Sequence, residues 1–468
     1  MHFRPARAFD LEAEMITVTE YSGQKVGVFG LGKAGEATVA ALLAGGAEVF
    51  ADDDKASSLS TVRYSEWPWA ELKALILSPG VPLTHPAPHA VVEMAKAHSV
   101  PVIGDIELLY RACPDATYVG ITGTNGKSTT TTLVGHILKS AGFAVEVGGN
   151  LGTAALSLVP LGKGGIYVLE LSSYQLDLLK TTRFNVAAFL NVTPDHLDRH
   201  GSMEGYVAAK MHIFDRQQAG DVAIVATDDD YTKRVYSELM HGPAILIEAS
   251  AYHDPASENG LNIDVQNGKL RSGGHVYDLS PITTLTGRHN WQNAAVAYAI
   301  ARACEVKSGT IYDAMKTFGG LRHRLQLVAT INGVRFINDS KATNADATAN
   351  ALLPYDTIYW IAGGKPKEGG ITSLNLYFPK ITHAFLIGEA EGEFARMLEG
   401  KVAYTRCRTL DVAVKKAAEM ALAEGKKDAV VLLSPACASF DQFKSFEHRG
   451  DAFCAMVEAL NESKRHAS

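Results

Sequence analysis

A glycine-rich stretch between a predicted strand and a predicted helix carries the strongest chemical signal in the sequence. It follows the apolar run 118–122 and consists of Gly123, Thr124, Asn125, Gly126, Lys127, Ser128 and Thr129. In such a turn, backbone N–H groups surround phosphate oxygens, the lysine adds positive charge and the hydroxyl binds Mg²⁺. The full phosphate-loop pattern has a glycine where Ile121 stands here. We predict a nucleotide phosphate site, and a plain glycine turn remains the alternative.

A second glycine-rich turn, 30–35, follows the apolar strand 25–29. Its glycine spacing fits the dinucleotide fingerprint, and Asp52 and Asp53 stand about twenty residues later, where an acid binds a ribose. Two interpretations stay open: a dinucleotide site, and a tight strand-to-helix turn that binds no dinucleotide. A nicotinamide-dependent oxidoreductase does not need a second phosphate loop, and this chain has one.

Polar residues also stand at the ends of two later apolar strands. Glu170 follows the strand 166–169, and His196 lies between two aspartates after the strand 186–190. Open α/β sheets place their ligand crevice at such strand ends, so Glu170 is a candidate Mg²⁺ ligand. His196 is a candidate metal ligand or a group that orients a nucleophile. Taken singly, a glutamate at a strand end is more often a solvated or capping residue, and a lone histidine is more often part of a surface turn; the neighbouring phosphate loop reverses this weighting for Glu170.

Four other polar residues are left undecided by their spacing alone. Lys210 lies in a helical pattern, where a lysine is ordinarily solvated. Asn290 and Asn293 stand at the head of an apolar helix, where asparagine usually caps. Asp339 follows the strand 335–338 and is compatible with a simple helix start.

The elements that must position these residues alternate between strands and helices, which predicts an α/β protein. At 468 residues the chain exceeds the ~250–300 residues of a single hydrophobic core. We predict domains at 1–105, 106–320 and 321–468, with a small β-ribbon at 262–286 and a possible hinge at the Gly319–Gly320 pair. We expect residues 1–14 to form a disordered extension.

Composition narrows the class of protein. Hydrophobic residues make up 47% and charged residues 20%, as in ordinary globular enzymes, and the net charge of -7 leaves no basic surface for nucleic acid. The 5 cysteines lack paired or metal-ligand spacing, so we expect reduced thiols that serve in packing. No signal peptide and no run of roughly 18 apolar residues is found. We therefore expect a cytoplasmic protein that binds neither nucleic acid nor membrane.

The motifs together resemble the Mur ligase family over residues of about 24 to 455. The strings at 123–129, 170–173, 191–196, 287–290 and 338–344 occur in the family's order, which is more specific than any one motif. The stretch 433–443, with Phe446, Arg449 and Gly450 after it, is most similar to the members that join D-glutamate to UDP-N-acetylmuramoyl-L-alanine. A sister ligase, an oxidoreductase and a non-catalytic nucleotide-binding module remain the alternatives.

The resemblance implies an α/β fold of three domains. The first is Rossmann-like and holds the UDP of the substrate; the second is a P-loop ATPase-type domain; the third is Rossmann-like and brings D-glutamate. It also implies ATP and two Mg²⁺ ions as cofactors, UDP-N-acetylmuramoyl-L-alanine and D-glutamate as the small-molecule substrates, and a monomer. The implied reaction is the formation of an acyl phosphate and its displacement by the glutamate amine, a step in cytoplasmic peptidoglycan precursor synthesis.

The same resemblance assigns roles residue by residue. The catalytic residues are Lys127, Glu170, His196, Lys210 and Arg324. ATP contacts 123–129 together with Asn290, Asn293, Arg324 and Asp339. The UDP substrate contacts Gly30, Gly32, Lys33, Ala34, Asp52, Asp53, Ser78, Pro79, Gly80, Asn150 and His196. D-Glutamate contacts Lys341, Thr343, Lys367, Ser439 and Phe446. The metal ligands are Ser128, Glu170, His196 and Lys210, the last as a carbamate.

Overall fold

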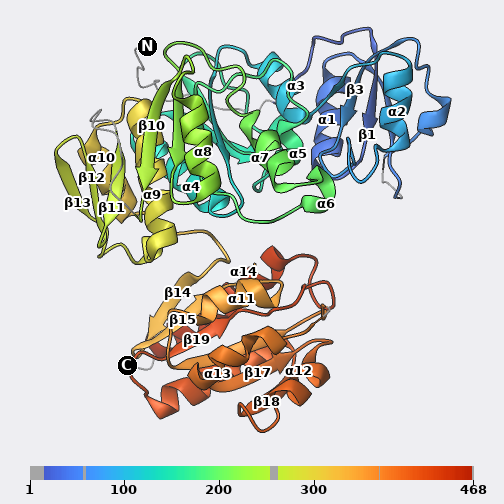
Figure 1. Cartoon of the computed structure of the whole chain (residues 1–468). Coiled ribbons are helices and arrows are strands. Elements are labelled where there is room, and N and C mark those ends of the chain that lie inside the picture. The colour runs from blue at the N-terminus through green and yellow to red at the C-terminus, as the bar shows by residue number, and fades with distance from the viewer. Residues whose placement is uncertain (1–14, 56–58, 253–261, 368, 466–468) are drawn as a thin grey trace. The chain divides into compact units, whose positions relative to one another are not determined.

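The computed structural model describes residues 15–55, 59–252, 262–367 and 369–465 (Figure 1). The prediction of a disordered extension at 1–14 lies outside these residues. The chain divides into two compact units, Met1–Phe318 and Gly319–Ser468, and holds three sheets. The α/β fold class is confirmed, whereas the predicted boundary at 105 stays a prediction, because both sheets of the first unit lie in one compact body.

The first sheet is parallel and has the strand order β2-β1-β3-β4. Its strands are β1 (Lys25–Phe29), β2 (Glu48–Asp52), β3 (Leu72–Leu77) and β4 (Val102–Ile103). Its helices are α1 (Lys33–Ala44), α2 (Ala90–Ala97), α3 (Asp105–Ala112) and the short 3₁₀ segment η1 (Tyr64–Glu66). The apolar runs that predicted strands are buried here, and the predicted βαβ unit is β1–α1–β2.

The second sheet has nine strands in the order β13-β12-β11-β10-β9-β8-β5-β7-β6. The strands are β5 (Thr117–Thr122), β6 (Ala144–Gly149), β7 (Gly165–Glu170), β8 (Val186–Phe189), β9 (Val222–Ala226), β10 (Ile245–Ser250), β11 (Ile263–Gln266), β12 (Lys269–Ser272) and β13 (His275–Asp278). The pairs from β6 to β11 are parallel, whereas β11, β12 and β13 form the predicted antiparallel ribbon. Strand β5 lies between β7 and β8, so residues that follow these strands meet at one sheet edge.

Helices cover both faces of this sheet. They are α4 (Lys127–Ser140), α5 (Ser173–Leu176), α6 (Leu197–His200), α7 (Met203–Met211), α8 (Asp230–Leu239), α9 (Arg288–Ala303) and α10 (Ser308–Lys316), with 3₁₀ segments η2 (Ala155–Ser157) and η3 (Thr283–Leu285). Successive side chains of a strand point to opposite faces. Val119 and Ile121 therefore join the core under α4 and α9, and Tyr118 joins the core that also contains β1 of the first sheet.

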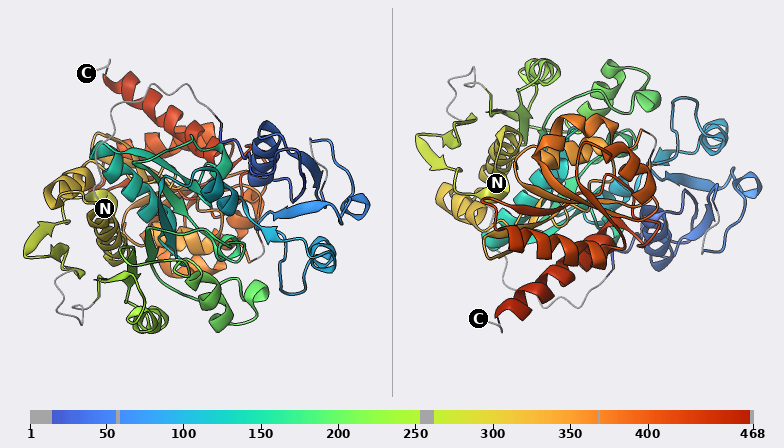
Figure 2. Two further views of the ribbon diagram at one scale, coloured as in Figure 1. Left: turned by 90° about the horizontal axis from the view of Figure 1, so that it is seen from above. Right: turned by 90° about the horizontal axis from the view of Figure 1, so that it is seen from below.

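The second unit contains a six-stranded sheet of order β14-β15-β19-β16-β17-β18, parallel except for β14. Its strands are β14 (Gln326–Ile331), β15 (Val334–Asn338), β16 (Ile358–Gly363), β17 (Ile381–Ile387), β18 (Tyr404–Arg408) and β19 (Val430–Leu433). Its helices are α11 (Ala345–Leu352), α12 (Glu391–Leu398), α13 (Leu410–Glu424), α14 (Phe446–Arg465) and the 3₁₀ segment η4 (Thr372–Lys380). Figure 2 shows the red helix α14 along one face of this sheet.

The cysteines carry free thiols, as the sequence predicted. Cys113, Cys304, Cys407 and Cys437 are buried, and Cys454 is half-buried. Burial raises the pKa of the Cys304 and Cys437 thiols to about 12. Within the described residues, no helix combines the length and the apolar character that a membrane crossing requires.

Candidate functional site

The predicted phosphate loop joins the end of β5 to the start of α4. Gly126 precedes the helix with φ 81, a left-handed backbone conformation that favours glycine, and provides no side-chain cap. The first N–H groups of α4 are thus not capped by the side chain of that residue. A Cβ at Gly126 would lie 2.2 Å from Oδ1 of Asn293, so the turn has room only for glycine. This geometry supports a phosphate-binding turn.

Lys127, the first residue of α4, folds back onto its own loop. Its Nζ donates hydrogen bonds to the carbonyl oxygens of Gly123 at 2.8 Å and Thr124 at 2.9 Å. The neighbouring Ser128 is buried at 9% exposure. The ammonium group is therefore held beside the uncapped helix N-terminus, where an anion is favoured.

A second turn, which follows β8, is hydrogen-bonded to this loop. Asn191 accepts from the backbone N–H of Asn125 at 2.8 Å and donates to its carbonyl oxygen at 3.1 Å. The backbone N–H of Thr193 donates to Oγ1 of Thr124 at 3.1 Å. Two motifs that are far apart in the sequence thus form one polar rim at the carboxyl edge of the sheet.

Lys210 in α7 is not the solvated helix lysine that its local pattern favours. It is 1% exposed, and its Nζ donates to the carbonyl oxygen of Gly123 at 2.9 Å and lies 4.5 Å from the centre of the Tyr206 ring. Burial and the nearby positive charge of Lys127 lower the pKa of Lys210 to about 7. At neutral pH a large fraction of this amine is therefore uncharged.

Glu170 ends β7 next to the phosphate loop. It is 3% exposed, and its Oε1 accepts a hydrogen bond from Nδ2 of Asn150 at 2.7 Å. Its Oε2 is buried and has no hydrogen-bond partner among the described residues. A buried carboxylate oxygen without a donor is costly unless a cation binds it. The capping role that the sequence left open is therefore not what this side chain performs.

His196 lies in the turn after β8 and has a left-handed backbone, with φ 52. Its side chain is 48% exposed, its Nε2 lies 3.4 Å from Oδ2 of Asp195, and its ring packs on Tyr174 at 5.0 Å. The described part of the chain holds no cluster of three or more His, Cys, Asp and Glu side chains suited to a metal ion. His196 and Glu170 are thus separate candidate ligands rather than parts of a closed protein cage.

His200, which sequence reasoning missed, is buried one turn beyond His196. Its Nε2 lies 2.8 Å from Oγ of Ser173, and its ring stacks on Tyr174 at 5.4 Å. Burial, with the charge of Lys210, lowers the pKa of His200 to about 4, so the imidazole is neutral. A lone histidine in a polar stretch gives no sequence signal that it will be buried against Ser173 and Tyr174.

The first turn of α9 packs against the phosphate-loop helix. Asn293 is buried, and its Oδ1 accepts from Oγ1 of Thr130 at 3.2 Å. Its Nδ2 donates to Oδ1 of Asn290 at 3.3 Å, and Asn290 in turn donates to the carbonyl oxygen of Thr286 at 3.0 Å. Both asparagines are thus fixed beside the phosphate loop, which is more than helix capping requires.

Asp52 and Asp53, the two aspartates singled out in the sequence, connect loops of the first sheet by hydrogen bonds to backbone N–H groups. Asp52 is buried, and its carboxylate accepts from the backbone N–H groups of Asp53 and Tyr64, each at 2.9 Å. Asp53 accepts from the backbone N–H of Leu31 at 2.5 Å. Asp53 thus braces the glycine turn, whereas Asp52 fixes the backbone at Asp53 and Tyr64. Gly32 and Lys33 are exposed at the start of α1, and Ala34 is half-buried.

The loop after β3 is attached to the glycine turn 30–35 and to helix α6. Oγ of Ser78 donates to the carbonyl oxygen of Gly30 at 2.6 Å. Arg199 in α6 donates to the carbonyl oxygens of Gly80 at 3.1 Å and Pro79 at 3.5 Å, and its guanidinium lies 4.4 Å from the centre of the Tyr174 ring. The predicted uridine-binding loop is therefore joined to the segment that carries His196.

In the second unit, Asp339 follows β15 and is 5% exposed. Its Oδ2 accepts from Oγ of Ser434 at 2.8 Å and its Oδ1 from the backbone N–H of Leu325 at 3.1 Å. Burial raises the pKa of Asp339 to about 7. The bond to Leu325 holds the exposed Arg324 beside this carboxyl group, as the prediction of a shared role requires.

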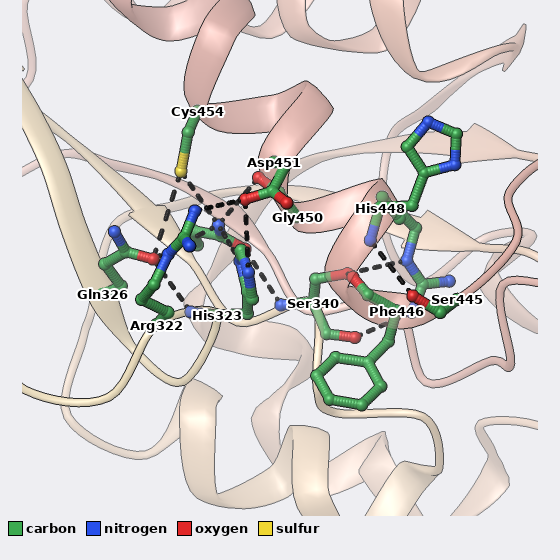
Figure 3. Close-up of polar contacts among 12 residues, drawn as sticks. Arg322, His323, Gln326, Ser340, Ser445, Phe446, His448, Gly450, Asp451 and Cys454 are labelled. Carbon is green, nitrogen blue, oxygen red and sulfur yellow. Dashed lines mark hydrogen bonds and ion pairs between the residues drawn. The ribbon is translucent and has the colours of Figure 1, made fainter. Parts of the chain in front are cut away.

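His323, which sequence reasoning also missed, holds the loop that follows β15 in place. It is buried, its Nδ1 lies 3.0 Å from Nδ2 of Asn338, and its Nε2 lies 3.5 Å from Asp451 (Figure 3). Its carbonyl oxygen accepts from the backbone N–H of Lys341 at 3.0 Å. His323 thus fixes both Arg324, its neighbour in the chain, and the predicted amino-acid site.

The residues predicted to bind D-glutamate lie on converging segments. Nζ of Lys341 lies 5.6 Å from the centre of the Phe446 ring, and the backbone N–H of Thr343 donates to the carbonyl oxygen of Lys341 at 2.8 Å. Ser439 is buried at 2% exposure, whereas Lys367 is exposed. Lys365 and Ala438 form a β-bridge, which brings the segments of Lys367 and Ser439 together.

Comparison with known proteins gives matches over the whole chain. Residues 121–301 match the family description "Mur ligase middle domain" and residues 323–437 match "Mur ligase, glutamate ligase domain". The UDP-N-acetylmuramoylalanine–D-glutamate ligase of Rhodospirillum rubrum is 49% identical over 97% of this chain and 98% of its own length. The same ligase of Paramagnetospirillum magneticum is 49% identical over 96% and 99%.

Solved structures show the same fold at low identity. A UDP-N-acetylmuramoyl-L-alanyl-D-glutamate–2,6-diaminopimelate ligase superposes with a TM-score of 0.56 at 18% identity, over 79% of this chain and 89% of that chain. The UDP-N-acetylmuramate-alanine ligase of Thermotoga maritima gives 0.51 at 16% identity, over 93% and 99%.

Proposed function

This chain belongs to the Mur ligase family, and from that premise we propose how its residues carry out the reaction. It is an ATP-dependent ligase that adds D-glutamate to UDP-N-acetylmuramoyl-L-alanine in peptidoglycan precursor synthesis, as its relatives of near-equal length do. The observation that carries the residue assignments is the convergence of Lys127 and Lys210 on the carbonyl oxygen of Gly123 at the edge of the sheet. That convergence brings the ammonium group of Lys127 and the amine of Lys210 together on the loop where a triphosphate would bind.

The reaction proceeds in two displacements. The carboxylate oxygen of the L-alanyl arm attacks the γ-phosphorus of ATP, the bond to the ADP oxygen breaks, and an acyl phosphate forms. The amine of D-glutamate then attacks the acyl carbon, the carbon–oxygen bond to phosphate breaks, and the amine loses a proton. Positioning and charge neutralisation are the main contributions of a protein to such transfers.

Lys127 is proposed to move from its loop carbonyl oxygens to the β- and γ-phosphates of ATP. The N–H groups at the start of α4 would bind the same phosphates. Arg324 would stabilise the charge of the transferring phosphoryl group, and Asp339 would position Arg324. Asn290 and Asn293 are proposed to contact ATP beside the loop, because their amides are fixed there.

Two Mg²⁺ ions are proposed, and the residues present fit them. The unpartnered Oε2 of Glu170 and the hydroxyl of Ser128 would hold the metal near the phosphates, and His196 would bind the second ion. Mg²⁺ in such a site neutralises phosphate charge. The remaining ligands would come from the nucleotide, the substrate and a modified Lys210, since the described side chains alone do not complete a cage.

We propose that Lys210 is carbamylated in the active enzyme. Its uncharged amine would add to the carbon of CO₂, a nitrogen–carbon bond would form, and one proton would leave. The product is an anionic carbamate that can bind a metal ion. It replaces the ammonium form of Lys210, which would be a second cation beside Lys127. The lowered pKa of Lys210, caused chiefly by burial, supplies the uncharged nucleophile that this addition needs.

The two substrates are proposed to bind to residues of different compact units. The UDP would bind to the turn with Gly30, Gly32, Lys33 and Ala34 and to the loop 78–80, while Asn150 would contact the acceptor arm. Asp53 would act mainly by bracing the glycine turn and Asp52 by fixing the loops at Asp53 and Tyr64, because backbone N–H groups occupy their carboxylates. D-Glutamate would bind to Lys341, Thr343, Lys367, Ser439 and Phe446. We also propose a cytoplasmic monomer, as the family resemblance implies.

Phosphate release tests the function most directly. The protein would be incubated with ATP, Mg²⁺ and UDP-N-acetylmuramoyl-L-alanine, together with D-glutamate, L-glutamate, D-aspartate, L-alanine or no amino acid. We expect release that depends on D-glutamate, and a product heavier by one glutamyl residue. Release with another amino acid would indicate a sister ligase, and ATP binding without release would indicate a non-catalytic module.

A further inference from the structure

A buried guanidinium lies at the centre of the segments that carry the proposed D-glutamate residues. Arg449, in the first turn of α14, is 1% exposed. Its Nε donates to Oγ of Ser340 at 2.9 Å and its Nη2 to the carbonyl oxygen of Ser340 at 2.8 Å. Its Nη1 donates to the carbonyl oxygens of Cys437 at 3.1 Å and Ala438 at 3.3 Å. One side chain thus connects two loops that are far apart in the sequence.

Two of these acceptors belong to peptides that join directly to a proposed ligand of D-glutamate. The carbonyl group of Ser340 precedes Lys341, and the carbonyl group of Ala438 precedes Ser439. The backbone N–H of Lys365 also donates to the carbonyl oxygen of Ala438, at 2.9 Å, so the loop of Lys367 shares the same anchor.

Phe446, another proposed ligand of D-glutamate, is attached through Ser340. Oγ of Ser340 accepts from Arg449 and donates to the carbonyl oxygen of Phe446 at 2.8 Å, and Figure 3 shows Ser340 beside Phe446. Lys341 then places its ammonium group 5.6 Å from the centre of the Phe446 ring. The aromatic ring and the lysine are therefore held by one continuous chain of hydrogen bonds.

Arg449 is an unusual choice for a purely structural position. Among the described residues no carboxylate lies within ion-pair distance of it, and its partners are a hydroxyl and carbonyl oxygens. Burial lowers the pKa of Arg449 only to about 10, so the cation persists at neutral pH. Burying a charge is costly unless it is hydrogen-bonded, and here all the bonds of the guanidinium go to acceptors of two separate loops. Its rigid, planar fork does fix the geometry of several acceptors at once.

We propose that Arg449 is a positioning residue for the amino-acid site, which sets the separation of Lys341, Ser439 and Phe446 without contacting substrate. The inference rests on the proposed function, because it assumes that these residues bind D-glutamate. It assigns Arg449 to the second half of the reaction. Acyl phosphate formation needs ATP and the UDP substrate but no glutamate, and should not depend on Arg449.

The test compares Arg449→Lys and Ser340→Ala with the wild-type enzyme. Lysine keeps the charge but cannot span both loops, so the KM for D-glutamate should rise about tenfold or more. Ser340→Ala removes the link to Phe446 and the acceptor of Arg449 Nε but keeps the bonds of Arg449 to the three carbonyl oxygens, so it should raise the KM for D-glutamate less. Acyl phosphate formation, measured without D-glutamate as the hydroxamate trapped by hydroxylamine, should stay within about twofold of the wild-type rate, as should the KM values for ATP and the UDP substrate.

Arg396→Lys, at an exposed position of α12, serves as the matched control and should leave all four quantities unchanged. An unchanged KM for D-glutamate in both variants would overturn the proposal. A parallel fall in hydroxamate formation and glutamate use would also overturn it, since this indicates a general structural role. If Arg449→Lys does not fold, Ser340→Ala decides by the same criteria. A wild-type enzyme that does not use D-glutamate would instead refute the proposed function.

Discussion

Two lysines from different helices donate hydrogen bonds to the same oxygen atom, the carbonyl oxygen of Gly123. Nζ of Lys127 lies 2.8 Å from it and Nζ of Lys210 lies 2.9 Å from it. Two ammonium groups this close repel each other strongly in a buried site. The less exposed amine therefore gives up its proton more easily, which explains why Lys210 is the one suited to modification.

Lys127→Ala is expected to lower ligation by about 100-fold or more, since a single preorganised charge on a transferring group has that magnitude. Phosphate release at saturating substrates measures the effect. Lys139→Ala, at an exposed position near the end of the same helix, is the control and should be near normal. Turnover by Lys127→Ala within a few-fold of wild type would remove this lysine from the mechanism.

The pKa of about 7 for Lys210 predicts how carbamylation depends on pH. The pKa of the amine is lowered from its ordinary value, so the amine is mostly protonated well below pH 7 and mostly uncharged well above pH 7. After CO₂ has been removed, activity should therefore return faster at pH 8 than at pH 6 when bicarbonate is added in amounts that give the same dissolved CO₂ concentration at both pH values.

Lys210→Ala provides the control for this prediction. It should be nearly inactive at both pH values and insensitive to bicarbonate, but partly restored by short carboxylates that occupy the place of the carbamate. Wild-type activity in Lys210→Ala would show that this lysine takes no part in the reaction.

Single residues were the hardest feature to predict from the sequence. The chemistry of 123–129 was predicted from local spacing, and the structure places these residues in a turn between β5 and α4. The burial of Lys210 and the roles of His200, His323 and Arg449 depend on contacts between distant segments, for which an isolated polar residue gives no local signal. For Lys210 only the family resemblance supplied the signal.

At the scale of elements, the join between β5 and α4 depends on one glycine. Gly126→Ala should weaken ATP binding and lower the unfolding temperature, because its backbone has φ 81 and its Cβ would meet Asn293 at 2.2 Å. Gly142→Ala is matched in backbone, with φ 87, and has nothing within 4 Å. Both variants bear the left-handed cost of about 1–2 kcal/mol.

The difference between the two variants isolates the collision with Asn293. Calorimetric titration with a non-hydrolysable ATP analogue and thermal unfolding would measure it. We expect Gly142→Ala to bind the analogue normally and to lose only modest stability. Equal behaviour of the two proteins would show that the phosphate loop tolerates a side chain at Gly126.

Strands and their order were largely predictable, because buried parallel strands are continuous apolar runs. The run predicted at 25–29 is β1 itself, and the runs at 166–169 and 186–190 differ from β7 and β8 by a residue at their ends. The short helices α5 and α6 escaped prediction. Their 4-residue lengths are too short for a periodic pattern, and contacts such as that of Arg199 with Gly80 fix them instead.

At the scale of the whole molecule, the proposed ATP and amino-acid residues belong to two compact units, Met1–Phe318 and Gly319–Ser468. Amine and acyl phosphate must meet, so we expect the units to approach each other when both substrates are bound. Small-angle scattering should show a smaller radius of gyration with an ATP analogue and the UDP substrate together than with either alone. An unchanged radius in protein shown to hold both ligands would count against this closure.

The free cysteines have a practical consequence for measuring such a movement. A maleimide dye reacts with thiolates, and burial keeps Cys304, Cys407 and Cys437 both inaccessible and protonated, with raised pKa values. Cys113 is also buried, which leaves only the half-buried Cys454 as a competing site. Replacing Cys454 alone would give a nearly unlabelled background. A pair of cysteines introduced at exposed positions, one per unit, would then carry a fluorescent donor and acceptor without rebuilding the hydrophobic cores.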